Sequence, residues 1–157
     1  MRKKKIYLDT SVISFIFADD SPDFKDITID FFEHYSKDYE LYISEIVILE
    51  INKNTSNDLK KAMLDTLKKY DIKELLYNEE IEIIAKTYLV NKIIPENKEE
   101  DALHVAYTTY YQIDILLSWN FRHLANIKKE EKIIIENMKI GYNYPIRLLS
   151  PLEVLDE

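Results

Sequence analysis

Two polar residues of the sequence directly follow short apolar runs that are typical of buried strands. Asp9 comes after the run 6–8, and Asn120 comes after the segment 116–119. In an open parallel sheet, ligands bind beyond the carboxyl ends of the strands. We therefore expect the side chains of Asp9 and Asn120 to point into one crevice.

Two further acids, Glu50 and Asp101, stand where solvent exposure does not explain them. Glu50 lies inside the apolar run 46–51, where an ionised carboxylate is costly unless it is paired or bound to a metal. Asp101 is the first residue of the stretch 101–106, which we expect to form a buried helix face of small residues. Each acid also has a purely structural interpretation, as a helix cap, a solvated edge residue or a partner of a helix dipole. Their joint placement in one chain favours a shared site.

Apolar runs alternate along the chain with segments of helical periodicity. Strands are predicted at residues 5–8, 41–43, 72–77, 114–118 and 146–149, and helical segments at residues 12–17, 23–39, 59–70, 79–91, 98–112, 121–126 and 129–140. The segment 45–53 fits either a strand or a buried helix capped by Ser44. Asn97 and Glu100 resemble a capping box at the start of the helix 98–112. The alternation predicts an α/β sandwich with a mainly parallel sheet.

The composition excludes several kinds of catalytic site. The chain has no cysteine, which excludes disulfides, thiol nucleophiles and thiolate zinc sites. Its single glycine, Gly141, cannot supply the glycine-rich loop of a Rossmann or P-loop protein. The three histidines are too widely spaced for a zinc motif of the HExxH type. The length of 157 residues fits one domain, which we expect to span residues 1–157.

The chain is acidic, with 29 acidic and 21 basic residues and a net charge of −8. A general nucleic-acid-binding protein usually has an excess of basic residues. Binding of nucleic acid by this chain would therefore need a small basic patch and a bound cation. The apolar run 6–8 is too short for a signal peptide, and no stretch approaches the length of a membrane span. These features predict a cytoplasmic protein without a membrane partner.

Four segments of the chain resemble, in order, the motifs of PIN-domain nucleases. They are residues 6–13 around Asp9, residues 44–51 around Glu50, residues 100–106 around Asp101 and residues 116–124 around Asn120. The third segment is the most distinctive, and the resemblance spans residues 5 to about 150. It implies a PIN-like three-layer α/β/α sandwich with a mainly parallel central sheet. It also implies a helix at residues 45–53.

The resemblance further implies the residues of the site. Asp9, Glu50 and Asp101 match the family's metal-binding acids, and Ser11 matches its polar residue near the first acid. Many members carry an Asp where this chain has Asn120, and an amide keeps a ligand oxygen but removes one charge. Oxygen ligands select Mg²⁺ or Mn²⁺ over zinc. Such a cation would lower the pKa of a water and orient it toward a phosphodiester.

The implied activity is metal-dependent hydrolysis of RNA, as in the toxin of a VapC-type toxin–antitoxin pair. Such proteins generally form homodimers and are restrained by an antitoxin protein, so both partners are implied by the resemblance. Arg122 lies two residues past Asn120, and we expect it to contact an RNA phosphate together with Ser11 in the substrate site. The secondary candidates for phosphate contact are residues 3–5, which are all lysines, together with Lys128 and Lys129.

Other interpretations remain open at this point. Asn120 and the acidic balance also fit a nuclease-like scaffold that binds RNA or a protein partner without cutting. A receiver-like phosphoacceptor built around Asp9 lacks the paired acids expected beside the first strand. His104 shares a helix face with Asp101 and is either a metal ligand or a buried packing histidine. His123 is a candidate for substrate contact.

Overall fold

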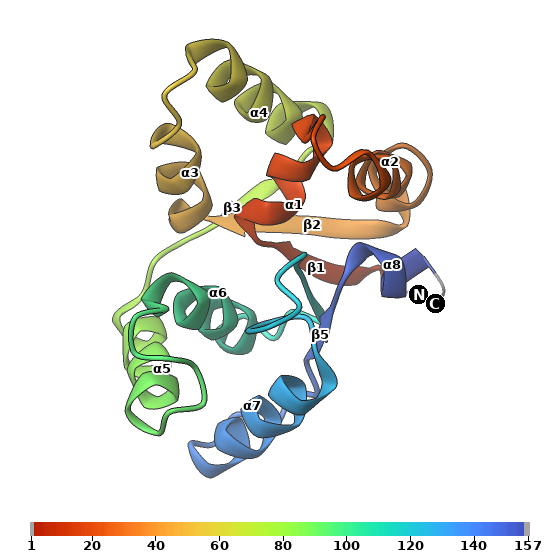
Figure 1. Cartoon of the computed structure of the whole chain (residues 1–157). Helices are drawn as coiled ribbons and strands as arrows, with labels where there is room; N and C mark the ends of the chain where they lie inside the picture. Colours follow the sequence, from red (N-terminus) through yellow and green to blue (C-terminus); the bar gives the residue numbers. More distant parts are fainter. Residues whose placement is uncertain (1, 156–157) are drawn as a thin grey trace.

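The computed structural model describes residues 2–155, which fold around a five-stranded sheet (Figure 1). The strands are β1 (Lys4–Leu8), β2 (Tyr39–Ser44), β3 (Lys73–Leu75), β4 (Ile115–Leu117) and β5 (Arg147–Leu149). They lie in the order β3-β2-β1-β4-β5, and every pair of neighbours is parallel. The predicted α/β class with a mainly parallel sheet is confirmed.

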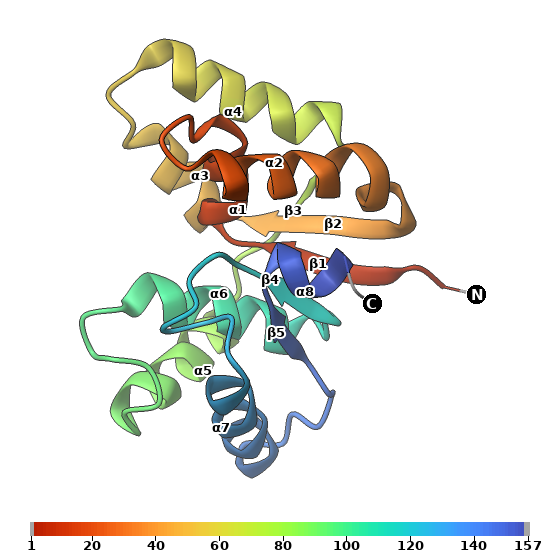
Figure 2. The ribbon, with the colours of Figure 1, turned by 45° about the vertical axis from the view of Figure 1, so that its right-hand side comes forward.

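Helices cover both faces of the sheet and make a three-layer sandwich (Figures 1 and 2). One face carries α1 (Thr10–Ser14), α2 (Pro22–Asp30), α3 (Glu45–Asn52), α4 (Asn57–Lys69) and α8 (Pro151–Leu155). The other face carries α5 (Glu79–Val90), α6 (Glu99–Tyr110) and α7 (Ile127–Lys139). Within residues 2–155, none of the helices is long and apolar enough to cross a membrane.

The alternation of side chains along the strands explains why the molecule has two cores. Ile6 and Leu8 point into the core beneath α1 to α4, while Tyr7 between them points into the core beneath α5 to α7. In β4, Leu116 faces the same core as Tyr7. Because both faces are covered, the inner strands consist of nearly continuous apolar residues, which is the pattern that made them predictable.

The central strand is β1, and the sheet extends from it in two directions. The strands β2 and β3 lie on one side of it, and β4 and β5 lie on the other. The direction of chain progress therefore reverses between β1 and β4, and a crevice opens beyond the carboxyl ends of strands at such a reversal. Asp9 and Ser118 are the residues that follow these two strand ends.

The segment 45–53, which fits a strand or a helix by propensity, is almost entirely the helix α3. Ser44 ends β2 with extended backbone, and its hydroxyl accepts a hydrogen bond from the backbone N–H of Ile46 at 3.3 Å. Val47 and Ile51 are buried against the sheet. The capping serine and the burial of this face select the helix, as the family resemblance implied.

The predicted capping box at the start of α6 is wrong. The backbone N–H of Lys98 bonds to the carbonyl of Pro95 at 2.8 Å, and this turn makes Lys98 the N-cap residue. No side chain caps the helix there. Asn97 therefore lies outside the helix, one residue too early for the capping role.

One other local prediction differs from the structure, and one helix was not predicted. The helix predicted at residues 23–39 is α2, followed by a π-helical turn at Phe31–Tyr35 and a 3₁₀ turn at Ser36–Asp38. The segment 121–126, expected to be a short helical turn, forms turns and bends. The helix α8 was not predicted, because five residues are too few to show a helical period.

The carboxylate of Asp114 ties the start of β1 to the loop before β4. It accepts hydrogen bonds from Arg2 at 2.8 and 2.9 Å, from the backbone N–H of Lys5 at 2.8 Å and from the Tyr144 hydroxyl at 2.5 Å. The hydrogen bonds from Arg2, more than any other contact, hold the pKa of Asp114 well below its usual range. This cluster fixes the register of the two strands whose far ends build the crevice.

Candidate active site

Asp9 is a buried carboxylate at the point where the strand order reverses. Its side chain is 5% exposed. One carboxylate oxygen accepts hydrogen bonds from the Ser11 hydroxyl at 2.5 Å and the Val12 backbone N–H at 3.3 Å. The other oxygen accepts a hydrogen bond from the Ser118 hydroxyl at 2.5 Å. Asp9 is thus the N-cap of α1 and, at the same time, an acid held in a fixed orientation.

Burial raises the pKa of Asp9, against the charge of His104 and the hydrogen bonds from Ser11 and Ser118, which lower it. The ionised form is therefore held at a cost in this position. A positive charge placed near Asp9 would offset that cost.

Two serine hydroxyls connect the ends of β1 and β4. The Ser11 hydroxyl donates to Asp9 and accepts from the Trp119 backbone N–H at 2.9 Å. The Ser118 hydroxyl donates to Asp9 and accepts from the Asn120 backbone N–H at 2.9 Å. Each serine therefore orients Asp9 and fixes the backbone of the fourth sequence motif.

Glu50 lies on α3 and contacts His104 of α6. One Glu50 oxygen is 3.1 Å from His104 Nε2, and His104 Nδ1 is 2.6 Å from the Tyr7 hydroxyl. The Tyr7 hydroxyl also lies 2.7 Å from the hydroxyl of Ser44. His104 is 2% exposed and Tyr7 is fully buried. The chain Ser44–Tyr7–His104–Glu50 therefore leads from the second strand end to a half-buried carboxylate.

The contact between Glu50 and His104 determines the direction in which the pKa of each group is shifted. Burial acts to lower the pKa of His104, but the hydrogen bond to Glu50 and the nearby acids outweigh it, so the pKa is raised. Burial acts to raise the pKa of Glu50, but the hydrogen bond and charge of His104 outweigh it, so the pKa is lowered. Both shifts favour a protonated imidazole beside an ionised carboxylate.

Asp101 and Asn120 meet at the edge of a polar hollow. The Asn120 amide nitrogen donates to Asp101 at 3.3 Å, and the Asn120 amide oxygen accepts from the His123 backbone N–H at 3.0 Å. The hollow has a volume of about 410 Å³ and is lined by Asn97, Lys98, Glu99, Glu100, Asp101 and Asn120. Burial raises the pKa of Asp101, and the charge of Glu50 adds to the rise.

The three predicted acids lie within electrostatic reach of one imidazole. The negative charges of Asp9, Glu50 and Asp101 each act to raise the pKa of His104. The structure thus brings together residues that the sequence separates by about 90 positions. In the described part of the chain, residues 2–155, no three His, Asp or Glu side chains are arranged to hold a metal ion. Each acid is instead hydrogen-bonded to a donor of the protein.

Arg122 lies apart from the three acids. It is exposed, and it lines a second hollow together with residues at the start of α7. Its backbone carbonyl accepts a hydrogen bond from the Asn126 side chain at 2.9 Å. Among the six predicted site residues, Asp9 is hydrogen-bonded directly to Ser11 and is linked through Ser118 to Asn120. Arg122 is connected to these residues only through the turn that follows Asn120.

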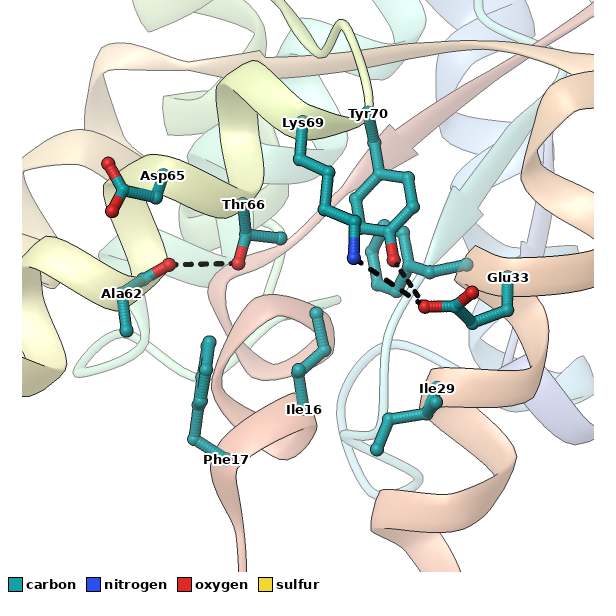
Figure 3. Close-up of a pocket in the computed structure, with 10 residues that line it drawn as sticks. Ile16, Phe17, Ile29, Glu33, Ala62, Asp65, Thr66, Lys69 and Tyr70 are labelled. Atoms are coloured by element: carbon teal, nitrogen blue, oxygen red, sulfur yellow. Dashed lines mark hydrogen bonds and ion pairs between the residues drawn. The ribbon is translucent and has the colours of Figure 1, made fainter.

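An apolar pocket of about 390 Å³ lies elsewhere, between the 3₁₀ turn Phe15–Phe17, the helix α2 with the turn that follows it, and α4 (Figure 3). Its wall includes Ile16, Phe17 and Ile29, and on one side the Glu33 carboxylate accepts a hydrogen bond from the Tyr70 hydroxyl at 3.1 Å. None of the predicted site residues lines this pocket. Its lining has no arrangement of acids around a base that would perform hydrolysis.

Sequence reasoning identified Ser44 as a helix cap but not as a partner of Tyr7, and it did not identify the roles of Tyr7 and Ser118. Ser118 directly follows an apolar strand, just as Asp9 does, and this position was a signal for the same crevice. The signal for Tyr7 was weaker. Tyr7 is a hydroxyl-bearing residue within the buried apolar run 6–8, where its hydroxyl needs a buried partner.

Comparison with known proteins agrees with this fold. Residues 6–129 match the family model of the PIN domain. No curated protein sequence matches the chain. A solved structure with the same fold is that of VapBC2 from Rickettsia felis bound to a DNA fragment from their promoter. It has a TM-score of 0.60 at 15% sequence identity, over 92% of this chain and 97% of that chain. Because the family model covers well over half of its length, the chain belongs to the PIN domain family.

Proposed function

We propose that the protein is a metal-dependent endoribonuclease that hydrolyses RNA phosphodiester bonds. The observation that carries this proposal is the grouping of Asp9, Glu50 and Asp101 around His104, beyond the strand ends of a PIN fold. Asp9, Glu50, Asp101 and Asn120 are its proposed catalytic and metal-binding residues. Ser11 and Arg122 are its proposed substrate-binding residues.

The donor chemistry of these residues fits Mg²⁺ or Mn²⁺. The available ligands are the oxygens of three carboxylates and one amide, which hard cations prefer. Burial raises the pKa of both Asp9 and Asp101, so a cation beside them would offset a cost that is already present. When bound, the cation supplies a water of lowered pKa and offsets negative charge on the phosphate.

The chain's own residues hold the acids in place. Ser11 and Ser118 orient the two oxygens of Asp9. His104, held by Tyr7, orients Glu50. Asn120 donates to Asp101, and it must give up this hydrogen bond if Asp101 is to offer the same lone pair to a cation. The site therefore exchanges internal hydrogen bonds for metal ligands when it is loaded.

We also infer the setting of a VapC-type toxin, with a homodimer, an antitoxin partner and a cytoplasmic location. The shared fold with VapBC2, solved with promoter DNA, supports this setting, as does the PIN family. The extent of a single PIN-like domain over residues 1–157 is part of the same proposal.

A second candidate is a scaffold that binds RNA or a protein partner without cutting. It is favoured by Asn120 at a position where an acid would add a ligand charge, and by the hydrogen bonds that satisfy each acid internally. Calorimetric titration with Mn²⁺ at neutral pH separates the two candidates. Binding that Asp9→Asn abolishes supports the nuclease, and an absence of binding supports the scaffold.

Cleavage of a labelled single-stranded RNA tests the nuclease directly. We expect cleavage with Mg²⁺ or Mn²⁺, none with EDTA and none with Asp9→Asn. The matched control is Asp65→Asn, because Asp65 is an exposed acid on α4 that pairs with Lys61. Cleavage that persists in EDTA or in Asp9→Asn would refute the proposed site.

A further inference from the structure

A hollow beside the candidate site is lined by four cationic side chains and by no acid. It has a volume of about 470 Å³ and is lined by Arg122, Asn126, Ile127, Lys128, Lys129 and Lys132. We call these six residues the cationic groove. In a chain with a net charge of −8, such a concentration of positive charge departs from the average surface. Phosphate is the anion that such a surface attracts most strongly in biology.

The local structure holds the cations of the groove on one side of α7. The Asn126 side chain accepts from the Lys129 backbone N–H at 2.7 Å and donates to the Arg122 carbonyl at 2.9 Å, which joins the turn to the helix. Lys128 and Lys132 are four residues apart and share a helix face. The Lys129 ammonium donates to the Ile93 carbonyl. The groove is therefore built on an ordered helix start.

The two acids of the same helix turn do not pair with the cations of the groove. Glu130 points to β5, where it accepts from Arg147 at 3.0 Å and from the Leu148 backbone N–H at 2.8 Å. Within residues 2–155, Glu131 forms no ion pair with Lys128, Lys129 or Lys132. Burial lowers the pKa of Lys129, and the charge of Lys132 lowers it further. Two ammonium groups therefore repel each other here, and a bound anion would relieve that repulsion.

The turn that follows Asn120 connects the hollow of Asp101 and Asn120 to the groove. Asn120 lines that hollow, and Arg122, two residues later in the chain, lines the groove. The His123 backbone N–H donates to Asn120 at 3.0 Å. Burial lowers the pKa of His123, Asp101 acts to raise it, and Arg122 and Lys129 act to lower it further. Both surfaces thus lie within electrostatic reach of one imidazole.

An exposed aromatic ring stands next to Arg122. Phe121 is 45% exposed, and its ring meets that of Trp119 edge-to-face with centroids 5.9 Å apart. A ring braced in this way offers a surface on which an unpaired base can stack. A duplex keeps its bases stacked on each other, so this feature favours a single strand.

We propose that the cationic groove binds the phosphate backbone of single-stranded RNA on one side of the bond to be cut, with Lys128 and Lys132 as the principal contacts. This inference rests on the proposed function, since it takes the hollow of Asp101 and Asn120 as the cleavage site. The strand then runs from that hollow past Arg122 onto the first turns of α7.

The test measures binding separately from cleavage. A labelled, unstructured RNA of about 12 nucleotides is titrated with the protein in EDTA, and fluorescence anisotropy gives Kd at several salt concentrations. Lys128→Ala/Lys132→Ala is compared with Lys61→Ala/Lys68→Ala, which removes the same charge from the exposed face of α4. We expect the groove variant to bind about tenfold more weakly near 0.1 M salt, with a salt slope shallower by roughly 1.4, because each single-strand phosphate contact contributes about 0.7.

Equal Kd values for the two double variants would overturn the inference. Wild-type binding to a duplex RNA as tight as to the single strand would overturn it as well. Failure of the proposed function is a separate result, since it appears as an absence of Mn²⁺-dependent cleavage while the groove variant still loses affinity. Loss of affinity in the groove variant together with cleavage by the wild type supports both proposals.

Discussion

The Nε2 atom of His104 lies 3.1 Å from a carboxylate oxygen of Glu50, and each group shifts the pKa of the other against the effect of its own burial. The imidazole is 2% exposed, so water screens this pair only weakly. Tyr7 holds the far nitrogen of the ring at 2.6 Å. The position of Glu50 in the candidate site therefore depends on a histidine that is out of reach of solvent.

This pair predicts a pH dependence of stability. The raised pKa of His104 means that its contribution is complete below its ordinary pKa of 6.5 and is lost as pH rises through the folded value. The lowered pKa of Glu50 means that its contribution is present above its ordinary pKa of 4.5 and is lost as pH falls through the folded value. We expect the wild type to be more stable than His104→Gln, with the largest difference between pH 4.5 and pH 6.5, the two ordinary pKa values. This difference should shrink toward pH 9.

Urea unfolding at pH 5.5, 7 and 9 measures this difference. The control is His34→Gln, because the His34 side chain is 71% exposed. A difference between wild type and His104→Gln that stays constant across the three pH values would show that the pair does not titrate with folding.

Tyr7→Phe should destabilise the protein by about 1–3 kcal/mol, because it leaves buried polar atoms of His104 and Ser44 without a partner. Tyr77→Phe is the matched control, since the Tyr77 hydroxyl bonds to Glu82 on the exposed surface. We expect the control to change the free energy of unfolding by less than about 0.5 kcal/mol. Equal effects of the two substitutions would contradict the role of the buried hydroxyl.

Ser118→Ala should destabilise the protein by about 1–3 kcal/mol and lower RNA cleavage, because Asp9 and the Asn120 backbone N–H both lose a partner. Ser150→Ala is the control. Its hydroxyl is also buried, but it has no hydrogen-bond partner among residues 2–155. Chemical denaturation measures the stability of both variants, and a cleavage assay measures their activity. An unchanged cleavage rate in Ser118→Ala would contradict the role of Ser118 in orienting Asp9.

Mn²⁺ should raise the melting temperature of the wild type but not that of Asp9→Asn. A ligand that binds only the folded state stabilises it by about 2.7 kcal/mol at one hundred times its Kd. In EDTA, Asp9→Asn should be at least as stable as the wild type, because it removes a carboxylate whose ionised form is disfavoured by burial. A thermal shift in Asp9→Asn equal to that of the wild type would place the cation elsewhere.

Asn120→Asp should tighten Mn²⁺ binding and destabilise the metal-free protein. The new carboxylate would lie beside Asp101, whose pKa is already raised by burial and by the charge of Glu50. Calorimetry gives the change in Kd, and urea unfolding in EDTA gives the change in stability. Weaker Mn²⁺ binding in this variant would mean that Asn120 faces away from the cation.

The sequence was sufficient to predict the parallel sheet. Strands buried on both faces are continuous apolar runs, and polar residues, Asp9 and Ser118, stand directly after two of them. The alternation with helical segments then indicated parallel strands. Propensity alone did not identify α3 as a helix, because residues 46–51 have strong strand propensity and only Ser44 indicates a helix start. The family resemblance was needed to choose the helix.

The partners of the acids could not be predicted from the sequence. Ser118 reaches Asp9 only because β1 and β4 pair with Leu8 opposite Leu117, and sequence patterns do not specify which strands are neighbours. In the same way, His104 meets Glu50 because α3 and α6 pack from opposite sides of the sheet end. The resemblance to PIN nucleases indicated which acids assemble, but not that His104 would stand among them.

The strand order has a consequence for when the site can exist during synthesis. Asp9 directly follows the first strand, yet the serine that orients its second oxygen stands 109 positions later. That serine directly follows β4, which lies beside β1 but is synthesised only after β2 and β3. A nascent chain that ends before β4 has the first acid without its anchoring hydroxyl and without Asn120. Ordering of the candidate site is thus delayed until most of the polypeptide has been synthesised.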